Sequence, residues 1–369
     1  MTGLGGALRG ARVVVVCGPG GVGKTTASAA IALRLAEHGR RVIVLTVDPA
    51  RRLAGALGLP DIPGDPVPIR AGEGVRLEAL QLDTKRTLDE LVAEQARDDE
   101  QRDRILANRF YQRMADTLSG TNEYMAMEKL HALSAEDRHD TIVIDTPPTR
   151  SALSFLDAPR RLTDFLGGRF LRVLLAPSAV AGRGALRVTN LGAQAFGKVI
   201  RRVTGAELLA DTAEFLSAFD GMYGGFKRRA ARVTDLLREP STRFVVVTSP
   251  EAQPLDEAAF FAERLRESSM PLGAVVANRC HGGRPRLPAG AERAAEALAG
   301  GDLERRVASA VLRTRLAWQL VDAREDDALA AFEAAHPGRP LVRVPELDGD
   351  VHDLEGLRRL GDRLFASSR

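Results

Sequence analysis

The chain has 369 residues, of which 44% are hydrophobic and 27% charged, and its formal net charge is +3. This is the composition of an ordinary globular protein, which excludes disordered and fibrous classes. The two cysteines, Cys17 and Cys280, form no C-x-x-C pair and support neither a disulfide framework nor a thiolate zinc site. We therefore expect a protein of the reducing cytoplasm.

Membrane-spanning and nucleic-acid-binding classes are also not expected. The longest apolar run after the first strand, "FLRVLLAPSAVA", is broken by Arg172 and Pro177 and is too short for a membrane helix of about 20 residues. No block of Lys and Arg with interleaved aromatic residues is present. We expect no nucleic-acid partner and no integral membrane protein, although a membrane could still be reached through a partner.

Short apolar runs alternate with segments of helical periodicity along most of the chain. A helix is predicted from Lys24 to the stop at Gly39. We predict strands at 12–17, 41–48, 75–83, 140–145, 243–249, 272–278 and 341–345. Strands that alternate with helices indicate a mostly parallel sheet covered on both faces, which is an α/β fold. The Gly- and Pro-rich segment 280–292 is predicted to be flexible.

A glycine-rich stretch, "CGPGGVGKTT", follows the first predicted strand and fits two templates. Gly18, Gly20 and Gly23 match the dinucleotide fingerprint G-x-G-x-x-G. The P-loop pattern G-x-x-x-x-G-K-[ST] is matched by Gly18 and Gly23 together with Lys24 and Thr25. The glycines alone do not separate these two interpretations.

Two further features favour the P-loop. A nucleoside triphosphate needs backbone N–H groups around its phosphates, an ammonium on the β and γ oxygens, a hydroxyl on Mg²⁺ and a carboxylate at a neighbouring strand end. Lys24 and Thr25 supply the ammonium and the hydroxyl, and the apolar run "TIVID" ends in Asp145. Asp48, near the end of the second strand, fits either template. We predict a triphosphate site with Mg²⁺.

Five sequence blocks occur in the order found in one known family. They are "GPGGVGKTT", "VDPARRLAGALG", "LEALQLDTKRTLDEL", "SGTNEYMAMEKL" and "DTPPTRSALSFLDAP". Together they resemble the ArsA-type ATPases, which include the arsenical-pump ATPase and the ATPase that targets tail-anchored membrane proteins. The family belongs to the dimeric P-loop group of MinD, ParA and the nitrogenase iron protein. The resemblance runs from residue 12 to the C-terminus and is weak between about 160 and 240.

This resemblance implies a fold and a domain organisation. The expected fold is a three-layer P-loop NTPase with a mostly parallel sheet flanked by helices, plus an α-helical subdomain. Residues 1–369 would form a single ATPase domain, with the subdomain inserted at approximately 86–135 and 160–240. In the targeting branch the subdomain exposes an apolar groove for a client helix. The alternative is that its apolar stripes pack on one another as an ordinary helical layer.

The resemblance also implies roles for individual residues. Lys24 and the loop amides would hold the phosphates, Thr25 would bind Mg²⁺ and Asp145 would hold the metal through water. Asp48 resembles the switch acid that orients or deprotonates the attacking water, and Asn278 the residue beside adenine. Either could instead be only a turn residue or a helix cap. The expected nucleotide-binding set is Gly18, Gly20, Gly21, Val22, Gly23, Lys24, Thr25, Thr26 and Asn278.

The chain departs from the family pattern at functional positions. The family loop reads G-K-G-G-V-G-K-T, and its first lysine reaches across the dimer to the partner's phosphates. Pro19 stands at that position here. The second switch, usually D-T-A-P-T-G-H, has Arg150 where Gly is usual and Ser151 where His is usual. Arg150 could supply a substitute charge or make only a surface ion pair.

Three functional hypotheses follow. The first is a Mg²⁺-dependent, dimeric ATPase whose nucleotide cycle controls a helical subdomain that binds a hydrophobic protein client or a membrane partner. The second is a nucleotide-binding regulatory subunit with little activity alone, paired with a related ATPase that retains the lysine. A more distant third is a MinD-like or ParA-like positioning ATPase. ATP and Mg²⁺ are the expected cofactors, with hydrolysis by this chain alone expected to be slow.

Overall fold

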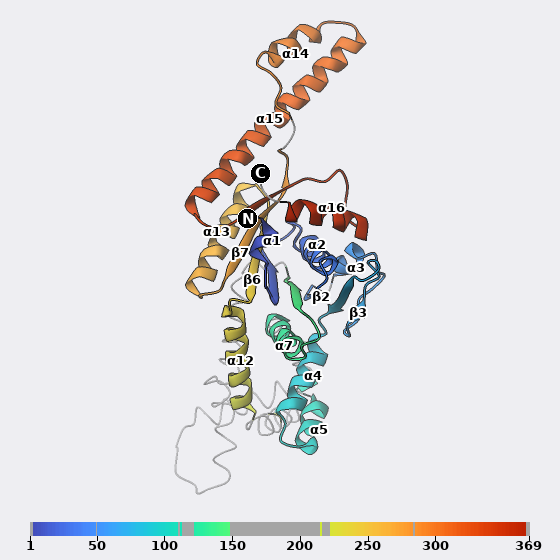
Figure 1. Cartoon of the computed structure of the whole chain (residues 1–369), viewed down its shortest axis with the longest axis vertical. Coiled ribbons are helices and arrows are strands. Elements are labelled where there is room, and N and C mark those ends of the chain that lie inside the picture. Colours follow the sequence, from blue (N-terminus) through green and yellow to red (C-terminus); the bar gives the residue numbers. More distant parts are fainter. Residues whose placement is uncertain are drawn as a thin grey trace, which may run out of the picture. The chain divides into compact units, whose positions relative to one another are not determined.

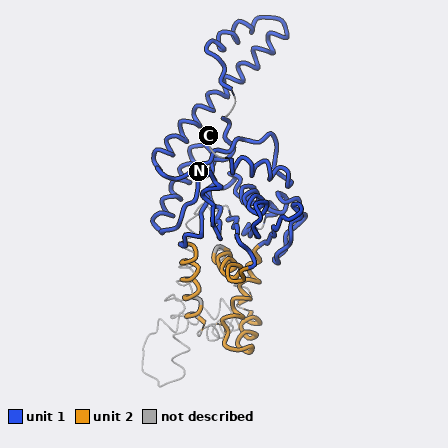
Figure 2. The backbone as a smooth tube through the Cα atoms, viewed as in Figure 1, with its two compact units in different colours: residues 1–81, 138–152, 238–369 blue, residues 82–137, 153–237 orange. Residues whose placement is uncertain are grey.

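The computed structural model describes residues 3–48, 50–109, 111–112, 122–147, 215, 222–282 and 285–366. The chain forms two compact units, shown in Figure 2. The first comprises Met1–Gln81, Arg138–Ala152 and Arg238–Arg369, and the second Leu82–Asp137 and Leu153–Leu237. Most of the second segment expected for the helical subdomain, at 160–240, lies outside the described residues, so the extent of that subdomain stays a prediction.

Among the described residues, eight strands form one sheet in the first unit (Figure 1). Its strand order is β3-β4-β2-β5-β1-β6-β7-β8, and only the pairing of β3 with β4 is antiparallel. The strands are β1 (Val13–Cys17), β2 (Arg41–Thr46), β3 (Val67–Pro68), β4 (Arg76–Gln81), β5 (Thr141–Asp145), β6 (Thr242–Thr248), β7 (Leu272–Cys280) and β8 (Leu341–Pro345).

The predicted α/β class with a mostly parallel sheet is confirmed. Each predicted strand corresponds to an observed one, because a parallel strand buried on both faces has a continuous apolar sequence. The short β3 was missed, since two residues carry no periodicity. The second strand was predicted two residues too long: β2 ends at Thr46, and the chain leaves the sheet before Asp48.

One face of the sheet is covered by α1 (Leu4–Ala7), α2 (Lys24–Glu37), α3 (Arg52–Ala56) and α16 (Leu354–Phe365). The side chains of Val14, Val16, Val245 and Val247 meet these helices in the main apolar core. Helix α2 is rich in alanine, which lets it lie close to the strands, and it packs against α16. This packing positions the first turn of α2 beside the carboxyl end of β1.

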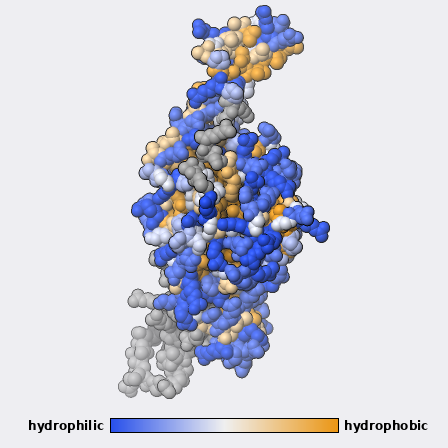
Figure 3. Space-filling view, viewed as in Figure 1, coloured by the Kyte–Doolittle hydropathy of each residue, from blue (hydrophilic) through white to orange (hydrophobic). Residues whose placement is uncertain are grey.

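The other face carries α13 (Ala252–Glu267), which packs on β6, β7 and α15 (Leu303–Ala335). With the sheet in the middle, these elements make the three layers of the expected fold. Helix α15 pairs with α14 (Ala291–Ala299) in a hairpin that extends from the sheet (Figure 1). Four large apolar side chains of α15 are exposed, and Figure 3 shows the apolar surface of this hairpin. They are Leu303, Val307, Val311 and Leu320.

The described elements of the second unit are helices: α4 (Thr84–Gln95), α5 (Asp99–Ala107), α7 (Asn122–Ala135) and α12 (Tyr223–Arg238), whose last residue belongs to the first unit. A polar network that is largely buried links α4, α7 and α12. The Arg229 guanidinium donates to the carboxylates of Glu128 and Glu94, and the Tyr124 hydroxyl donates to Glu128. Among the described helices of both units, none is long and apolar enough to cross a membrane.

Candidate functional site

The predicted site residues of the first unit lie at one edge of the sheet, where the parallel strands end. Strand β1 leads into the glycine loop, β2 into Asp48, and β5 ends at Asp145. Asn278 lies near the end of β7. In open α/β sheets, ligands bind outside the carboxyl ends of the strands. The topology therefore brings together residues that are far apart in sequence.

The glycine loop needs glycine at two positions for steric reasons. Gly18 has a φ of +141°, and a Cβ there would lie 2.0 Å from the carbonyl oxygen of Val247. Gly23 has a φ of +94°, and a Cβ would lie 2.5 Å from the side-chain nitrogen of Asn278. At Gly18 any other residue would force the loop away from the β6 backbone, whereas at Gly23 it would displace the Asn278 amide and strain a left-handed backbone. The loop is thus held tightly against the sheet edge.

The amino end of α2 opens directly from this loop. Gly23 is the N-cap and Lys24 the first helical residue, with no acidic side chain in the first turn. The first N–H groups of a helix lack partners within the helix and attract anions. Gly20 and Gly21 are exposed, whereas Val22 is buried and anchors the loop. Thr25 and Thr26 are partly exposed in the first turn of the helix.

Lys24 lies at the centre of the loop with its side chain turned inward. Only 6% of this residue is exposed. Its ammonium donates a hydrogen bond to the carbonyl oxygen of Pro19 at 2.7 Å. Burial lowers the pKa of the ammonium, and the charge of Asp145 opposes that shift. A buried cation beside a glycine-rich loop and the start of a helix is suited to bind phosphate oxygens.

Asp145 is fully buried at the end of β5 and is surrounded by hydroxyl groups. Its Oδ2 accepts a hydrogen bond from Thr46 at 3.0 Å and its Oδ1 from Ser28 at 3.3 Å. Burial raises the pKa of this carboxyl to about 6, and the neighbouring Thr25 and Thr46 side chains limit the rise. In the ladder, Asp145 stands directly opposite Val16 of β1 and Thr46 of β2. The pairing and the bond from Ser28 place its carboxylate beside the start of α2.

Asp48 is held by its own turn. Its Oδ1 accepts a hydrogen bond from the N–H of Ala50 at 2.9 Å, and its N–H donates to Thr46 Oγ1 at 3.3 Å. Its Oδ2 lies 3.6 Å from Nη1 of Arg52. The residue is 8% exposed. The carboxylate is therefore fixed in orientation, which is what the activation of a water molecule requires.

The donors at this edge fit a magnesium ion bound together with a triphosphate. Mg²⁺ prefers oxygen ligands and keeps several of its waters, and P-loop enzymes bind it with one hydroxyl and one carboxylate besides phosphate. The Thr25 side chain lies near enough to Asp145 to oppose the rise in the pKa of that carboxyl. No cluster of three or more His, Cys, Asp or Glu side chains suited to a metal occurs in the part of the chain described, and this kind of site needs none.

Asn278 contacts the glycine loop itself. Its side-chain amide donates a hydrogen bond to the carbonyl oxygen of Val22 at 2.9 Å. The same nitrogen fills the space above Gly23. This contact ties the loop to β7 and gives Asn278 a structural role. Its predicted place beside adenine stays a prediction.

Sequence reasoning missed three side chains at this edge. Ser28 lies one helical turn after Lys24, so the period of α2 could have identified it. Thr46 is the last residue of β2, and its hydroxyl reaches both Asp145 and the N–H of Asp48. Arg52 follows Asp48 by one turn. Arg150, considered above as a substitute cation, lies outside the described residues.

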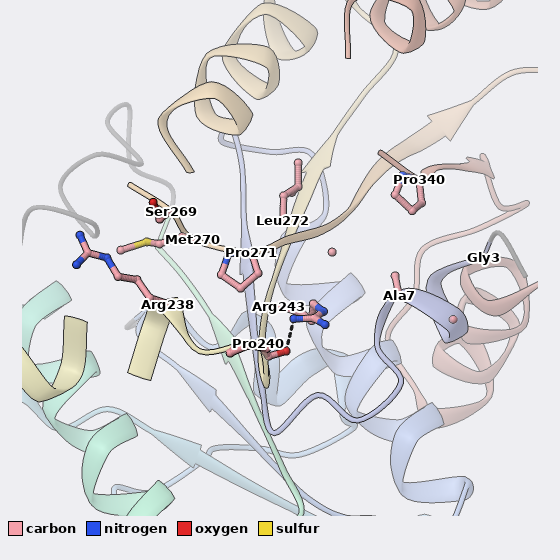
Figure 4. A pocket seen from close by; sticks show the side chains of 12 residues that line it. Gly3, Ala7, Arg238, Pro240, Arg243, Ser269, Met270, Pro271, Leu272 and Pro340 are labelled. Carbon is pink, nitrogen blue, oxygen red and sulfur yellow. Dashed lines mark hydrogen bonds between the residues drawn. The ribbon is translucent and has the colours of Figure 1, made fainter. Parts of the chain in front are cut away.

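A hollow lies at the opposite edge of the sheet, away from the glycine loop (Figure 4). It has a volume of about 640 Å³ and is lined by the starts of β6 and β7 and by α1. Arg243 donates to the carbonyl oxygens of Pro240 and Thr242, and Arg238 to that of Ser268. None of the described residues that line this hollow is acidic. It offers no acid–base pair, and we assign no chemistry to it.

The fold and the site together define a class of protein. A mostly parallel sheet, a glycine loop between β1 and α2, a buried lysine at the helix start and a carboxylate at the end of β5 make this a P-loop NTPase. The family model of the anion-transporting ATPases, ArsA_ATPase, matches residues 11–282. The chain therefore belongs to the ArsA-type ATPase family, as the sequence blocks predict.

Individual relatives agree with this family. The chain is 35% identical to an uncharacterised protein of Streptomyces coelicolor over 48% of its length and 43% of that protein. It is 30% identical to a putative arsenical pump-driving ATPase 1 of Aquifex aeolicus over 40% of its length and 38% of that protein. To the ATPase get3 of Aspergillus terreus it is 25% identical over 73% of both chains. The matches thus span less than half of the first two relatives and about three quarters of the third.

Proposed function

We propose that this chain binds ATP with Mg²⁺ at the edge formed by Gly18–Thr26, Asp48 and Asp145, and that it hydrolyses ATP slowly when alone. The observation that carries the proposal is the buried Lys24 ammonium at the start of α2, 6% exposed and within the electrostatic influence of the buried Asp145 carboxylate. Such a pair has little structural purpose, because burying charges costs more than a packed apolar pair. A triphosphate with a divalent cation accounts for both charges.

In this proposal, different residues of the chain have separate roles in hydrolysis. The loop N–H groups and Lys24 hold the β and γ phosphate oxygens. Asp48 orients a water so that its oxygen bonds to the γ phosphorus, while the bond to the bridging oxygen breaks and its electron pair leaves with ADP. The water proton passes to the Asp48 carboxylate. Bound Mg²⁺, held by Thr25 and through water by Asp145, would neutralise charge on the β and γ oxygens.

We further propose that the working form is a dimer and that its nucleotide cycle controls the helical second unit. The relative in Aquifex aeolicus is named for driving an arsenical pump, which is consistent with a partner that responds to the cycle. For this chain we expect a hydrophobic protein client or a membrane partner. In this proposal the affinity of α4, α7 and α12 for that client changes as the dimer opens and closes.

A second candidate is a heteromer with a related ATPase that retains the first lysine of the loop. The position of that lysine is occupied here by Pro19, which favours this candidate. Pro19 is buried, and its carbonyl is occupied by Lys24. A proline side chain carries no charge and donates no hydrogen bond, so a dimer of identical chains would lack the cross-subunit cation in both sites. A relative that retains the lysine would supply it to the site of this chain.

The decisive experiment measures ATP binding, ATP turnover and oligomeric state in the presence and absence of Mg²⁺. Calorimetry with a non-hydrolysable ATP analogue gives the affinity, and light scattering on a sizing column gives the mass with and without nucleotide. We expect Mg²⁺-dependent binding, slow turnover and a dimer with the analogue. No binding of ATP would refute the assignment. Binding by a permanent monomer would refute the dimer but leave the nucleotide site intact.

A further inference from the structure

The charged side chains of the candidate site balance one another before a nucleotide binds. Among the described residues, its charged groups are the carboxylates of Asp48 and Asp145 and the cations of Lys24 and Arg52. Lys24 is engaged by the Pro19 carbonyl, and the position of the family's cross-subunit lysine is Pro19 itself. A triphosphate would add further negative charge at the point where the reaction develops it. A cation that can move toward the γ phosphate would offset this charge together with Lys24 and Mg²⁺.

Arg52 can be that cation, because it lies beside Asp48 and its side chain is largely exposed. It is the first residue of α3, one turn after Asp48. Its Nη1 lies 3.6 Å from Asp48 Oδ2, which is close enough for an ion pair but too long for a hydrogen bond. No hydrogen bond joins its guanidinium to another described residue, and its side chain is 62% exposed. Its N–H donors are therefore available to a ligand.

The charge of Arg52 also acts on Lys24. Burial lowers the pKa of the Lys24 ammonium most, and the Arg52 charge lowers it further. The guanidinium lies beside Asp48, the carboxylate expected to activate water, and the γ phosphate must approach that same water. A planar guanidinium can contact a phosphate oxygen and the Asp48 carboxylate at once, because its separate N–H groups bind separate oxygens.

The neighbouring Arg51 provides a contrast within the same turn. Its Nη2 lies 3.7 Å from Asp61, and its side chain is 73% exposed. Its ion-pair partner, Asp61, is remote from the glycine loop in sequence, whereas the partner of Arg52 is the candidate switch acid. The two adjacent arginines have the same charge and similar exposure but different partners. They form a matched pair for mutagenesis.

We propose that Arg52 is a catalytic residue that stabilises the charge developing on the transferred phosphoryl group, in place of the lysine that Pro19 replaces. This inference rests on the proposed function, since it assumes that ATP binds at the glycine loop. In the ligand-free chain Arg52 pairs with Asp48. When the phosphoryl group arrives, a guanidinium N–H group moves to a γ oxygen while the charge of Asp48 keeps the fork nearby. The interaction strengthens as the bond to ADP breaks.

The test compares Arg52→Ala, Arg52→Lys and Arg51→Ala with the wild type in two assays. Single-turnover hydrolysis with Mg²⁺ measures the chemical step. Affinity for a non-hydrolysable ATP analogue, and for ADP with aluminium fluoride as a mimic of the transferring phosphoryl, measures binding without turnover. For Arg52→Ala we expect analogue affinity within about threefold of wild type, but a rate and a mimic affinity each lower by about 10²-fold. Arg52→Lys should restore part of both, and Arg51→Ala should match the wild type.

Each other outcome separates this inference from the proposed function. A wild type that binds and hydrolyses ATP while Arg52→Ala behaves identically would overturn the role of Arg52 and leave the ATPase assignment standing. Equal loss of analogue and mimic affinity would assign Arg52 to substrate binding and overturn a catalytic role. If Arg51→Ala lowered the rate and the mimic affinity as much as Arg52→Ala, the effect would come from general surface charge, and the specific role of Arg52 would be overturned. A wild type that binds no nucleotide would overturn both proposals.

Discussion

The ammonium of Lys24 donates a hydrogen bond to the backbone carbonyl of Pro19, five residues earlier, at 2.7 Å. The bond closes the glycine loop around a cation that is almost fully buried. The residue that stands in place of the family's first lysine therefore accepts a hydrogen bond from the second lysine. A bound phosphate would have to draw the ammonium away from this carbonyl.

Lys24→Ala should remove ATP binding. Without the ammonium, the phosphates would be held by backbone N–H groups alone, and we expect the affinity to fall by about 10²-fold or more. Calorimetry with a non-hydrolysable analogue checks this. Lys85→Ala, which removes an exposed lysine that pairs with Asp89, is the control. Unchanged binding in Lys24→Ala would disprove the P-loop assignment.

Asp48→Asn should act on turnover and not on binding. The amide keeps the size of the side chain and can still accept the hydrogen bond from the N–H of Ala50. It cannot accept a proton from water, so the rate should fall by about 10²-fold or more. Comparing the rate with the analogue affinity separates the two steps. A loss of affinity equal to the loss of rate would contradict the separate roles of Asp48 and Lys24.

Pro19→Lys should accelerate hydrolysis by the chain alone. A positive charge supplied in trans is worth about 10³ to 10⁵ in rate in other P-loop enzymes. We expect the variant to gain part of this and the wild type to gain it only when mixed with a lysine-containing relative. Steady-state turnover of the wild type, the variant and the mixture measures both effects. If all three rates are equal, the missing lysine is neutral and the heteromer proposal fails.

The buried network of the second unit should show a pH-dependent stability. Burial raises the pKa of Glu128, and the bonds from Tyr124 and Arg229 oppose this shift. Arg229→Met would leave the buried carboxylate without its cation and should destabilise the unit by about 3–5 kcal/mol at neutral pH. Without Arg229, the folded-state pKa of Glu128 would lie further above its unfolded value. Stability should therefore be higher at low pH and be lost as the pH rises through the folded pKa.

Urea denaturation of Arg229→Met at pH 5 and pH 8, followed by circular dichroism, measures this dependence. The double variant Glu128→Gln with Arg229→Met removes the buried charge together with its partner. It should recover much of the stability at pH 8 and lose the added pH dependence. A single variant equally destabilised at both pH values would instead indicate lost packing of the arginine stem.

Both thiols should resist alkylation in the folded protein. Cys17 and Cys280 are buried. Burial raises the pKa of the Cys17 thiol far above its usual range and that of Cys280 to about 11. Because the thiolate is the reactive form, iodoacetamide at pH 8 should leave the native mass unchanged and add two groups in urea. Modification of native Cys17 would show that the strand entering the glycine loop opens readily.

Much of the sheet could be predicted because its signals are local. Strands such as β1 and β5 are buried on both faces, so their sequences are continuous apolar runs. The spacing of Gly18, Gly23 and Lys24 reflects a loop whose backbone geometry excludes other residues. The family followed from five blocks in a fixed order, and the family model confirmed it. These features depend on neighbours in the chain and are therefore visible in the sequence.

The partners of each charge depend on strand order, which no local pattern encodes. Thr46 and Asp145 are 99 positions apart and Ser28 and Asp145 117 apart, yet their side chains are bonded because β5 lies between β2 and β1. The different partners of the adjacent Arg51 and Arg52 follow from the turn at the start of α3. Local periodicity and loop sterics thus account for the strands and the glycine loop, whereas three-dimensional packing sets the surroundings of each charge, because electrostatic contacts depend on distance in space.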